Sequence, residues 1–142
     1  MTMDRDIIQF NRLYRELDEI YHIYAKEHGL SDSALWILYS LVESNIRMTQ
    51  KDMCRLWHRP PQTINSALKR LEAQGMLKLI PAADSQKTKE IVLTDSGHDL
   101  VSRIILPVFQ AETRALRCMS IEERTLLLSM TAKYVDHLKE EI

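Results

Sequence analysis

Residues 59–72 read RPPQTINSALKRLE, and they place short hydrogen-bonding side chains and bases where a surface helix usually carries Glu and Lys. At 100° per residue, Gln62, Ser66 and Lys69 lie along one face of a helix. Amide side chains can bond adenine bidentately, hydroxyls can contact base edges or phosphates, and Lys or Arg can reach guanine or phosphate. The pattern favours a helix that binds in the major groove of DNA. A solvated polar face is the ordinary alternative.

The candidate contacts divide by their expected partner. The candidate base contacts are Gln62, Asn65, Ser66, Lys69 and Arg70, and the candidate backbone contacts are Arg59 and Thr63. The surrounding charge supports a polyanionic partner, because nine of the 19 Lys and Arg residues but only three of the 20 Asp and Glu residues lie between positions 47 and 89. A net charge of −1 for the whole chain therefore conceals a basic middle between acidic flanks.

Neighbouring elements must hold this helix in place. Its other face, with Ile64, Ala67, Leu68 and Leu71, is predicted to pack in the core. A short helix precedes it, predicted to begin after Thr49 as N-cap, with Asp52 completing a capping box and Met48 and Met53 forming a hydrophobic staple. That helix ends near Trp57, because Pro60 favours an extended residue before it and Pro61 suits a first helical turn. Two short helices with a turn of roughly three residues between them form a helix-turn-helix.

A β-hairpin is predicted directly after the helix pair. Residues 76–80 and 90–93 read as short strands, and the polar segment 81–89, PAADSQKTK, reads as a turn with a basic tip. A helix-turn-helix followed by a hairpin is a winged helix. The candidate DNA contacts of the wing, chiefly to phosphates, are Gln86, Lys87 and Lys89.

Long amphipathic helices are predicted on both sides of the winged helix. The expected ranges are residues 4–28, ended by Gly29, residues 32–44, capped by Ser31, residues 95–117, and residues 121–139, capped by Ser120. Pro107 should kink or interrupt the third of these helices. The fold class is therefore mainly α with a small β-hairpin wing.

The sequence argues against several other classes of protein. We find no GxSxG, P-loop or GxGxxG motif, no HExxH, and no arrangement of nucleophile and base, so we expect neither an enzyme nor a cofactor nor a metal site. Cys54 and Cys118 lie far apart and outside a CxxC pattern, so Cys54 is predicted to be a small buried hydrophobe, with thiol-based sensing as a minor alternative. The acidic N-terminal segment does not resemble a signal peptide, and no apolar run suits a membrane. We expect a cytoplasmic protein without a membrane partner.

Residues 52–97 resemble the winged-helix core of the MarR family of transcription regulators. The family pattern runs roughly ELAxxLxxxxSTVTRxVDRLExxGLVxR, followed by a wing and LTxxG. Residues 63–65 (TIN) match TVT, 70–72 (RLE) match RLE, 75–77 (GML) match GLV, and 93–97 (LTDSG) match LTxxG. The departures are Cys54 in place of Ala, His58 in place of a turn Gly, Leu79 in place of Arg, and 85–87 (SQK) in place of an Arg-containing wing tip.

The resemblance implies a homodimeric repressor that binds double-stranded DNA at a pseudo-palindromic operator. Residues 1–30 and 98–142 would then form a helical dimerisation region, and residues 31–97 the winged helix-turn-helix. It also implies a small phenolic or other aromatic anion as effector, and Tyr14, Tyr21, Trp36 and Tyr39 lie on helices that could line its cavity, although such aromatics are more often core. A winged helix used only for protein–protein interaction, without sequence-specific DNA binding, is the alternative.

Overall fold

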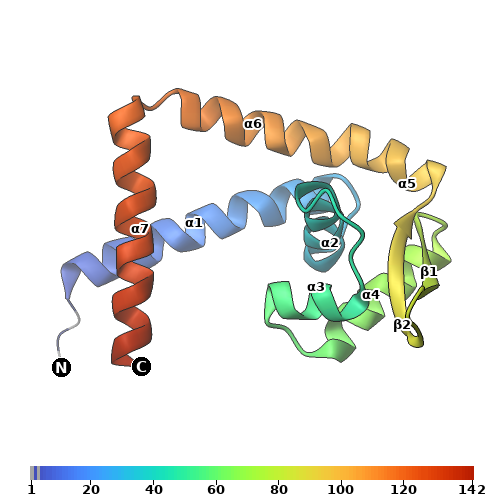
Figure 1. Cartoon of the computed structure of the whole chain (residues 1–142). Helices are drawn as coiled ribbons and strands as arrows, with labels where there is room; N and C mark the ends of the chain where they lie inside the picture. Colours follow the sequence, from blue (N-terminus) through green and yellow to red (C-terminus); the bar gives the residue numbers. More distant parts are fainter. Residues whose placement is uncertain (1, 3) are drawn as a thin grey trace. The chain divides into compact units, whose positions relative to one another are not determined.

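Side-chain caps fix where most of the helices begin. The computed structural model of the chain describes residue 2 and residues 4–142 (Figure 1). The elements are α1 (Arg5–Glu27), α2 (Asp32–Glu43), α3 (Gln50–Trp57), α4 (Pro61–Ala73), β1 (Leu77–Ala82), β2 (Ser85–Leu93), α5 (Asp95–Leu100), the π-helix η1 (Val101–Ile105), α6 (Leu106–Arg117) and α7 (Ile121–Glu141). Ser31, Thr49 and Ser120 each accept a hydrogen bond from a backbone N–H of the first helical turn. The capping box predicted at α3 is confirmed, and the predicted cap Ser120 forms a second capping box with Glu123 at α7.

Helices α1, α3 and α4 of the first unit are each followed by a residue with a positive φ angle. Gly29 and Gly75, at φ of 71° and 75°, follow α1 and α4, and Gly29 ends α1 as the sequence predicts. His58 ends α3 in the left-handed region at φ 48°. This is the position where the family pattern has glycine, and histidine adopts the conformation at some cost in backbone strain.

The core of the first unit lies between α2, the helix pair and the hairpin. Its fully buried side chains come from six elements and include Leu35, Leu38, Met53, Leu68, Leu71, Leu77 and Ile105. The core-facing prediction for α4 is confirmed at Ile64, Leu68 and Leu71, and Ala67 is half-buried. Ser40 is the buried polar side chain of α2, and its Oγ donates to the Trp36 carbonyl oxygen at 2.7 Å while accepting the Trp57 indole N–H at 3.0 Å.

The hairpin is longer than the sequence predicts. The two strands pair antiparallel from Leu77 opposite Leu93 to Ala82 opposite Ser85, so only residues 83 and 84 form the turn. The prediction that residues 81–89 form one mobile turn is therefore wrong. The polar composition of this segment hides its strand character because both faces near the end of the hairpin are solvated, and Pro81 is tolerated because the sheet has only two strands.

The predicted helix 95–117 is interrupted, as expected from Pro107. Residues 101–105 form a π-helical segment between α5 and α6. Because Pro107 has no N–H to donate to the carbonyl of Arg103, the helix cannot continue with regular bonding through this point. The Tyr24 hydroxyl donates to the Ile104 carbonyl oxygen at 2.7 Å, which ties α1 to the irregular segment, and burial raises the pKa of Tyr24.

The chain divides into two compact units, Met1–Ile105 and Leu106–Ile142. The first holds the helix pair, the hairpin and the core described above. The second holds α6 and α7, and no residue of α7 is buried. Of the helices formed by the described residues, none is both long and apolar enough to cross a membrane.

Candidate nucleic-acid interface

The polar face of α4 is open to solvent along its length. All predicted contact residues of this segment except Asn65 are exposed. The exposed residues are Arg59, Gln62, Thr63, Ser66, Lys69 and Arg70. The helix begins at Pro61 without a side-chain cap, because Pro60 occupies the N-cap position. Pro61 has no N–H to donate, and the N–H groups of Thr63 and Ile64 donate to the Pro60 carbonyl oxygen at 3.0 and 3.5 Å.

Asn65 is placed differently from its neighbours. It is half-buried, and its side-chain oxygen Oδ1 is buried without a hydrogen-bond partner among the described residues. An unpaired buried oxygen costs free energy, about 1–3 kcal/mol for a typical group. Asn65 therefore reaches outward less than Gln62 or Ser66 does, and its amide lines a groove beside the helix.

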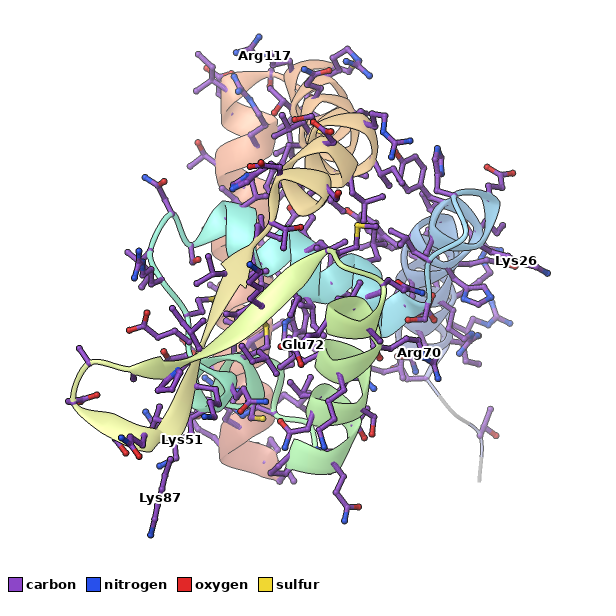
Figure 2. All side chains as sticks on the ribbon, turned by 90° about the vertical axis from the view of Figure 1, so that its right-hand side faces the viewer. Lys26, Lys51, Arg70, Glu72, Lys87 and Arg117 are labelled. Carbon is purple, nitrogen blue, oxygen red and sulfur yellow. The ribbon has the colours of Figure 1, made fainter. Side chains whose placement is uncertain are left out.

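That groove lies between α3, α4 and the wing. It has a volume of about 420 Å³, and its lining residues are Gln50, Lys51, Cys54, Arg55, Pro61, Asn65, Lys87, Thr88 and Lys89. Four of these nine residues are bases and none is an acid. Figure 2 shows Lys51 and Lys87 together near the end of the hairpin. A groove with this charge suits the phosphate backbone of a nucleic acid.

Lys51 and Arg55 are functional candidates that the sequence reasoning did not select. Both lie on α3, the first helix of the pair, and both are exposed. Their spacing of four residues is a signal that could have found them, because it places two bases on one face of a short helix. Cys54, predicted to be buried, is half-buried and lines the same groove.

The wing presents its bases through an irregularity in the strand pairing. Pro81 pairs with Lys89 and Ala82 with Ser85, so residues 86–88 have no partner on β1. Gln86 and Lys87 are exposed in this bulge, whereas Lys89 is half-buried in the paired part of β2. Lys87 extends away from the hairpin (Figure 2). A bulge of this kind re-aims side chains out of the sheet.

Three contacts hold the wing against α4 and against the segment before α3. The Glu72 carboxylate on α4 accepts the backbone N–H of Leu79 on β1 at 2.8 Å, and Figure 2 shows Glu72 between the helix and the hairpin. On the other strand, Ile91 donates its N–H to the Met48 carbonyl at 2.8 Å, and Arg47 pairs with Glu90 at 3.3 Å. Helix and wing are therefore coupled directly.

A second hollow lies on the other side of the first unit, against the aromatic cluster. Trp36 is at its centre, with ring centroids 4.8 Å from Tyr21 and 5.4 Å from Trp57. Two adjoining cavities of about 380 and 220 Å³ share Asp18, Trp36, Trp57 and Arg59 in their walls. We refer to them together as the aromatic cavity. Arg59, predicted as a backbone contact for DNA, lies at both the aromatic cavity and the turn before α4.

The residues expected near such a cavity are placed as follows. Tyr14, Tyr21 and Trp36 line the aromatic cavity, whereas Tyr39 stacks edge-on against Trp36 at 5.3 Å and is not part of the wall. Trp57 was not selected from the sequence. Over residue 2 and residues 4–142, no group of three or more His, Cys, Asp or Glu side chains is arranged to hold a metal ion.

Comparisons with known proteins agree with this geometry. A MarR family model matches residues 28–87. The HTH-type transcriptional regulator PecS of Dickeya dadantii (strain 3937) is 33% identical over 76 residues, which cover 54% of this chain. That stretch spans 46% of PecS, so the chain matches about half the length of this relative.

Two solved structures align over almost the whole chain. A putative MarR family transcriptional regulator from Listeria monocytogenes, complexed with a 26mer DNA, is 22% identical with a TM-score of 0.75, and the alignment covers 98% of this chain and 92% of that chain. The transcriptional regulator SlyA is 25% identical with a TM-score of 0.73, with coverage of 97% and 96%. The fold and the relatives are those of transcription regulators and not of enzymes. The winged helix and the match of the family model to residues 28–87 make this chain similar to the MarR family of transcription regulators.

Proposed function

We propose that the protein is a transcriptional regulator, specifically a repressor, that binds double-stranded operator DNA as a homodimer. The observation that carries the proposal is the basic groove of Lys51, Arg55, Lys87 and Lys89 beside the exposed polar face of α4. Phosphates in the groove would position the duplex, and the side chains of α4 would then reach base edges. The DNA complex of the Listeria relative supports this partner. Repression is the sign of regulation that the family resemblance implies.

The homodimer is supported by apolar side chains that a single chain leaves uncovered. On α1, the exposed residues Leu13, Leu17 and Ile20 recur at steps of four and three. On α7, the exposed residues Ile121, Leu128 and Val135 recur at steps of seven. A soluble monomer rarely exposes stripes of this size, so a second copy of the chain is the partner that we propose for them. Two copies would present two α4 helices to a pseudo-palindromic site.

Release by a small aromatic effector is part of the same proposal. The aromatic cavity supplies ring faces from Trp36, Trp57 and Tyr21, and it shares Arg59 with the approach to α4. A structural relative of 16% identity and TM-score 0.71, an organohalide-sensing regulator, is known in a form that binds 2,4-dichlorophenol. A ligand beside Arg59 would change the orientation of α4 and thereby the affinity of the protein for DNA.

The direct test is a mobility-shift titration over a salt series, using genomic fragments selected by binding to the wild-type protein. The double variant Lys69→Ala/Arg70→Ala should bind on the order of tenfold or more weakly, because each lost base or phosphate contact costs about 1 kcal/mol or more. For the wild type, log K should fall steeply with log salt concentration.

The matched control removes the same charge from a remote helix. Arg15→Ala/Lys26→Ala changes two exposed bases of α1 and should leave the affinity within about twofold. Equal losses in the two double variants would show a general charge effect and remove α4 as the recognition helix. A flat salt dependence would instead favour a winged helix that contacts only proteins.

A further inference from the structure

The charge of the aromatic cavity points to a class of ligand different from the phenolic anion that the family resemblance implies. Its wall holds two carboxylates, Asp18 and Asp32, and one guanidinium, Arg59. Asp18 borders both parts of the cavity. Acidic side chains therefore outnumber basic ones in a site whose remaining wall is largely aromatic and aliphatic.

The two carboxylates differ in their hydrogen-bond and ion-pair partners. Asp32 accepts from the ring of His22, whose Nδ1 lies 2.9 and 3.0 Å from its two carboxylate oxygens. Asp18 forms no ion pair with any residue that the structure describes, although Arg59 lines the same cavity. An unneutralised carboxylate at the edge of a half-buried cavity attracts a cation and disfavours an anion.

The rings add a second attraction of the same sign. The faces of aromatic side chains are negative, so they bind ammonium groups, and tryptophan does so most strongly. Trp36 and Trp57 stand 5.4 Å apart with an interplanar angle of 44°, and Tyr21 lies 4.8 Å from Trp36 at 53°. These inclined faces form an open aromatic enclosure with Asp18 beside it.

We propose that the aromatic cavity binds a small organic cation, an aromatic or alkyl amine in its ammonium form, with Asp18 as its charge partner and Trp36 and Trp57 as its walls. The inference deepens the effector site of the proposed function and rests on it for any role in regulation. The binding itself requires only the cavity.

Three probes that share a phenyl ring and differ in charge test the proposal: benzylammonium, benzyl alcohol and benzoate. Both tryptophans of the chain line the cavity, so intrinsic fluorescence reports its occupancy in the full-length protein. We expect benzylammonium to bind more tightly than benzyl alcohol, and benzoate to bind most weakly. Asp18→Asn should weaken benzylammonium about fivefold, whereas Arg59→Gln should strengthen it.

Glu19→Gln is the matched control, because it removes a carboxylate one residue away on an exposed position outside the cavity. It should leave all three affinities unchanged. Tighter binding of benzoate than of benzylammonium, an unaltered benzylammonium affinity in Asp18→Asn, or the absence of binding by any probe would each overturn the proposal. Operator binding by the ligand-free protein is measured separately, so a failure of DNA binding would count against the proposed function and leave the fluorescence result standing.

Discussion

Thr49 and Asp52 hold the start of α3 through two reciprocal hydrogen bonds. The Asp52 N–H donates to Thr49 Oγ1 at 3.1 Å, and the Thr49 N–H donates to the Asp52 carboxylate at 2.9 Å. The hydrogen bonds from the backbone and side chain of Thr49 hold the pKa of the Asp52 carboxyl below its ordinary value of 3.8. The folded state therefore binds the Asp52 proton less readily than the unfolded chain does.

This difference predicts how acid affects stability. The contribution of the Asp52 charge is fully present above pH 3.8 and is lost as the pH falls through the lowered pKa of the folded state. At pH 7, Asp52→Asn should lower the free energy of unfolding by about 1 kcal/mol, the usual worth of a cap. The gap between variant and wild type should close below pH 3.8 in urea titrations. Asp84→Asn, in the hairpin turn, should show neither effect, and a gap that persists in acid would contradict the assignment.

At single positions, the sequence predicts whether a side chain is exposed better than it predicts the direction in which that side chain points. The candidate contact residues of α4 are exposed as their helical spacing requires, except Asn65, which is half-buried and lines a groove together with residues of the wing. Lys51 and Arg55 join Lys87 and Lys89 in a groove only through that tertiary packing. Local periodicity carries no information about it.

At the scale of elements, Gly97 fixes the joint between the hairpin and α5. Its backbone packs so closely on the Met76 carbonyl that an added Cβ would overlap the oxygen and lie 3.1 Å from Leu93 Cδ2. The same carbonyl accepts the Thr94 N–H at 3.1 Å, and Thr94 Oγ1 caps α5 by accepting the Gly97 N–H. The glycine of the LTxxG motif is thus required by contact distance and not by a positive φ.

Gly97→Ala should therefore destabilise the protein by roughly 2–3 kcal/mol, because neither the carbonyl nor the cap can move without loss of a hydrogen bond. Thermal and urea unfolding followed by circular dichroism measure this. Ser96→Ala, one residue earlier and exposed, should change the free energy of unfolding by less than about 0.5 kcal/mol. An alanine variant as stable as the wild type would mean that the joint is looser than the structure shows.

The elements themselves could largely be predicted, because their ends are set locally. Ser31, Thr49, Ser120, Gly29 and Gly75 mark helix ends by chemistry that acts within one turn. The sequence predicts strands that are too short for the hairpin, because the strand pairing extends through polar residues whose composition resembles that of a loop. The break before Pro107 could be predicted, but its form as a π-helix could not, since Tyr24 and the core also determine it.

At the scale of the whole molecule, the dimer is the remaining prediction. Leu13→Glu places a charge within the exposed apolar stripe of α1, where Leu13 is 50% exposed in the single chain. If that stripe is covered by a second copy, the variant should elute and sediment as a monomer of 16.6 kDa while the wild type has about twice that mass. Gln9→Glu adds the same charge at an exposed polar position and should stay dimeric.

Loss of folding must be separated from loss of association. Retained helical circular dichroism in Leu13→Glu, together with a monomeric mass, would locate the interface on α1. A wild-type chain that is monomeric at all concentrations would remove the homodimer from the proposed function and leave a monomer that binds one half-site.

The bond between the Glu72 carboxylate and the Leu79 N–H has a consequence for the target sequence. Because this bond fastens α4 to the hairpin, the protein and not the duplex would set the distance between the proposed base contacts of α4 and the proposed phosphate contact of Lys87. Inserting one base pair between those two positions of an operator would displace the flank by about 3.4 Å and rotate it about the axis. Because the two contacts are held rigidly, they cannot follow that displacement. The affinity should therefore depend on the spacing within each half of the operator as much as on its base sequence.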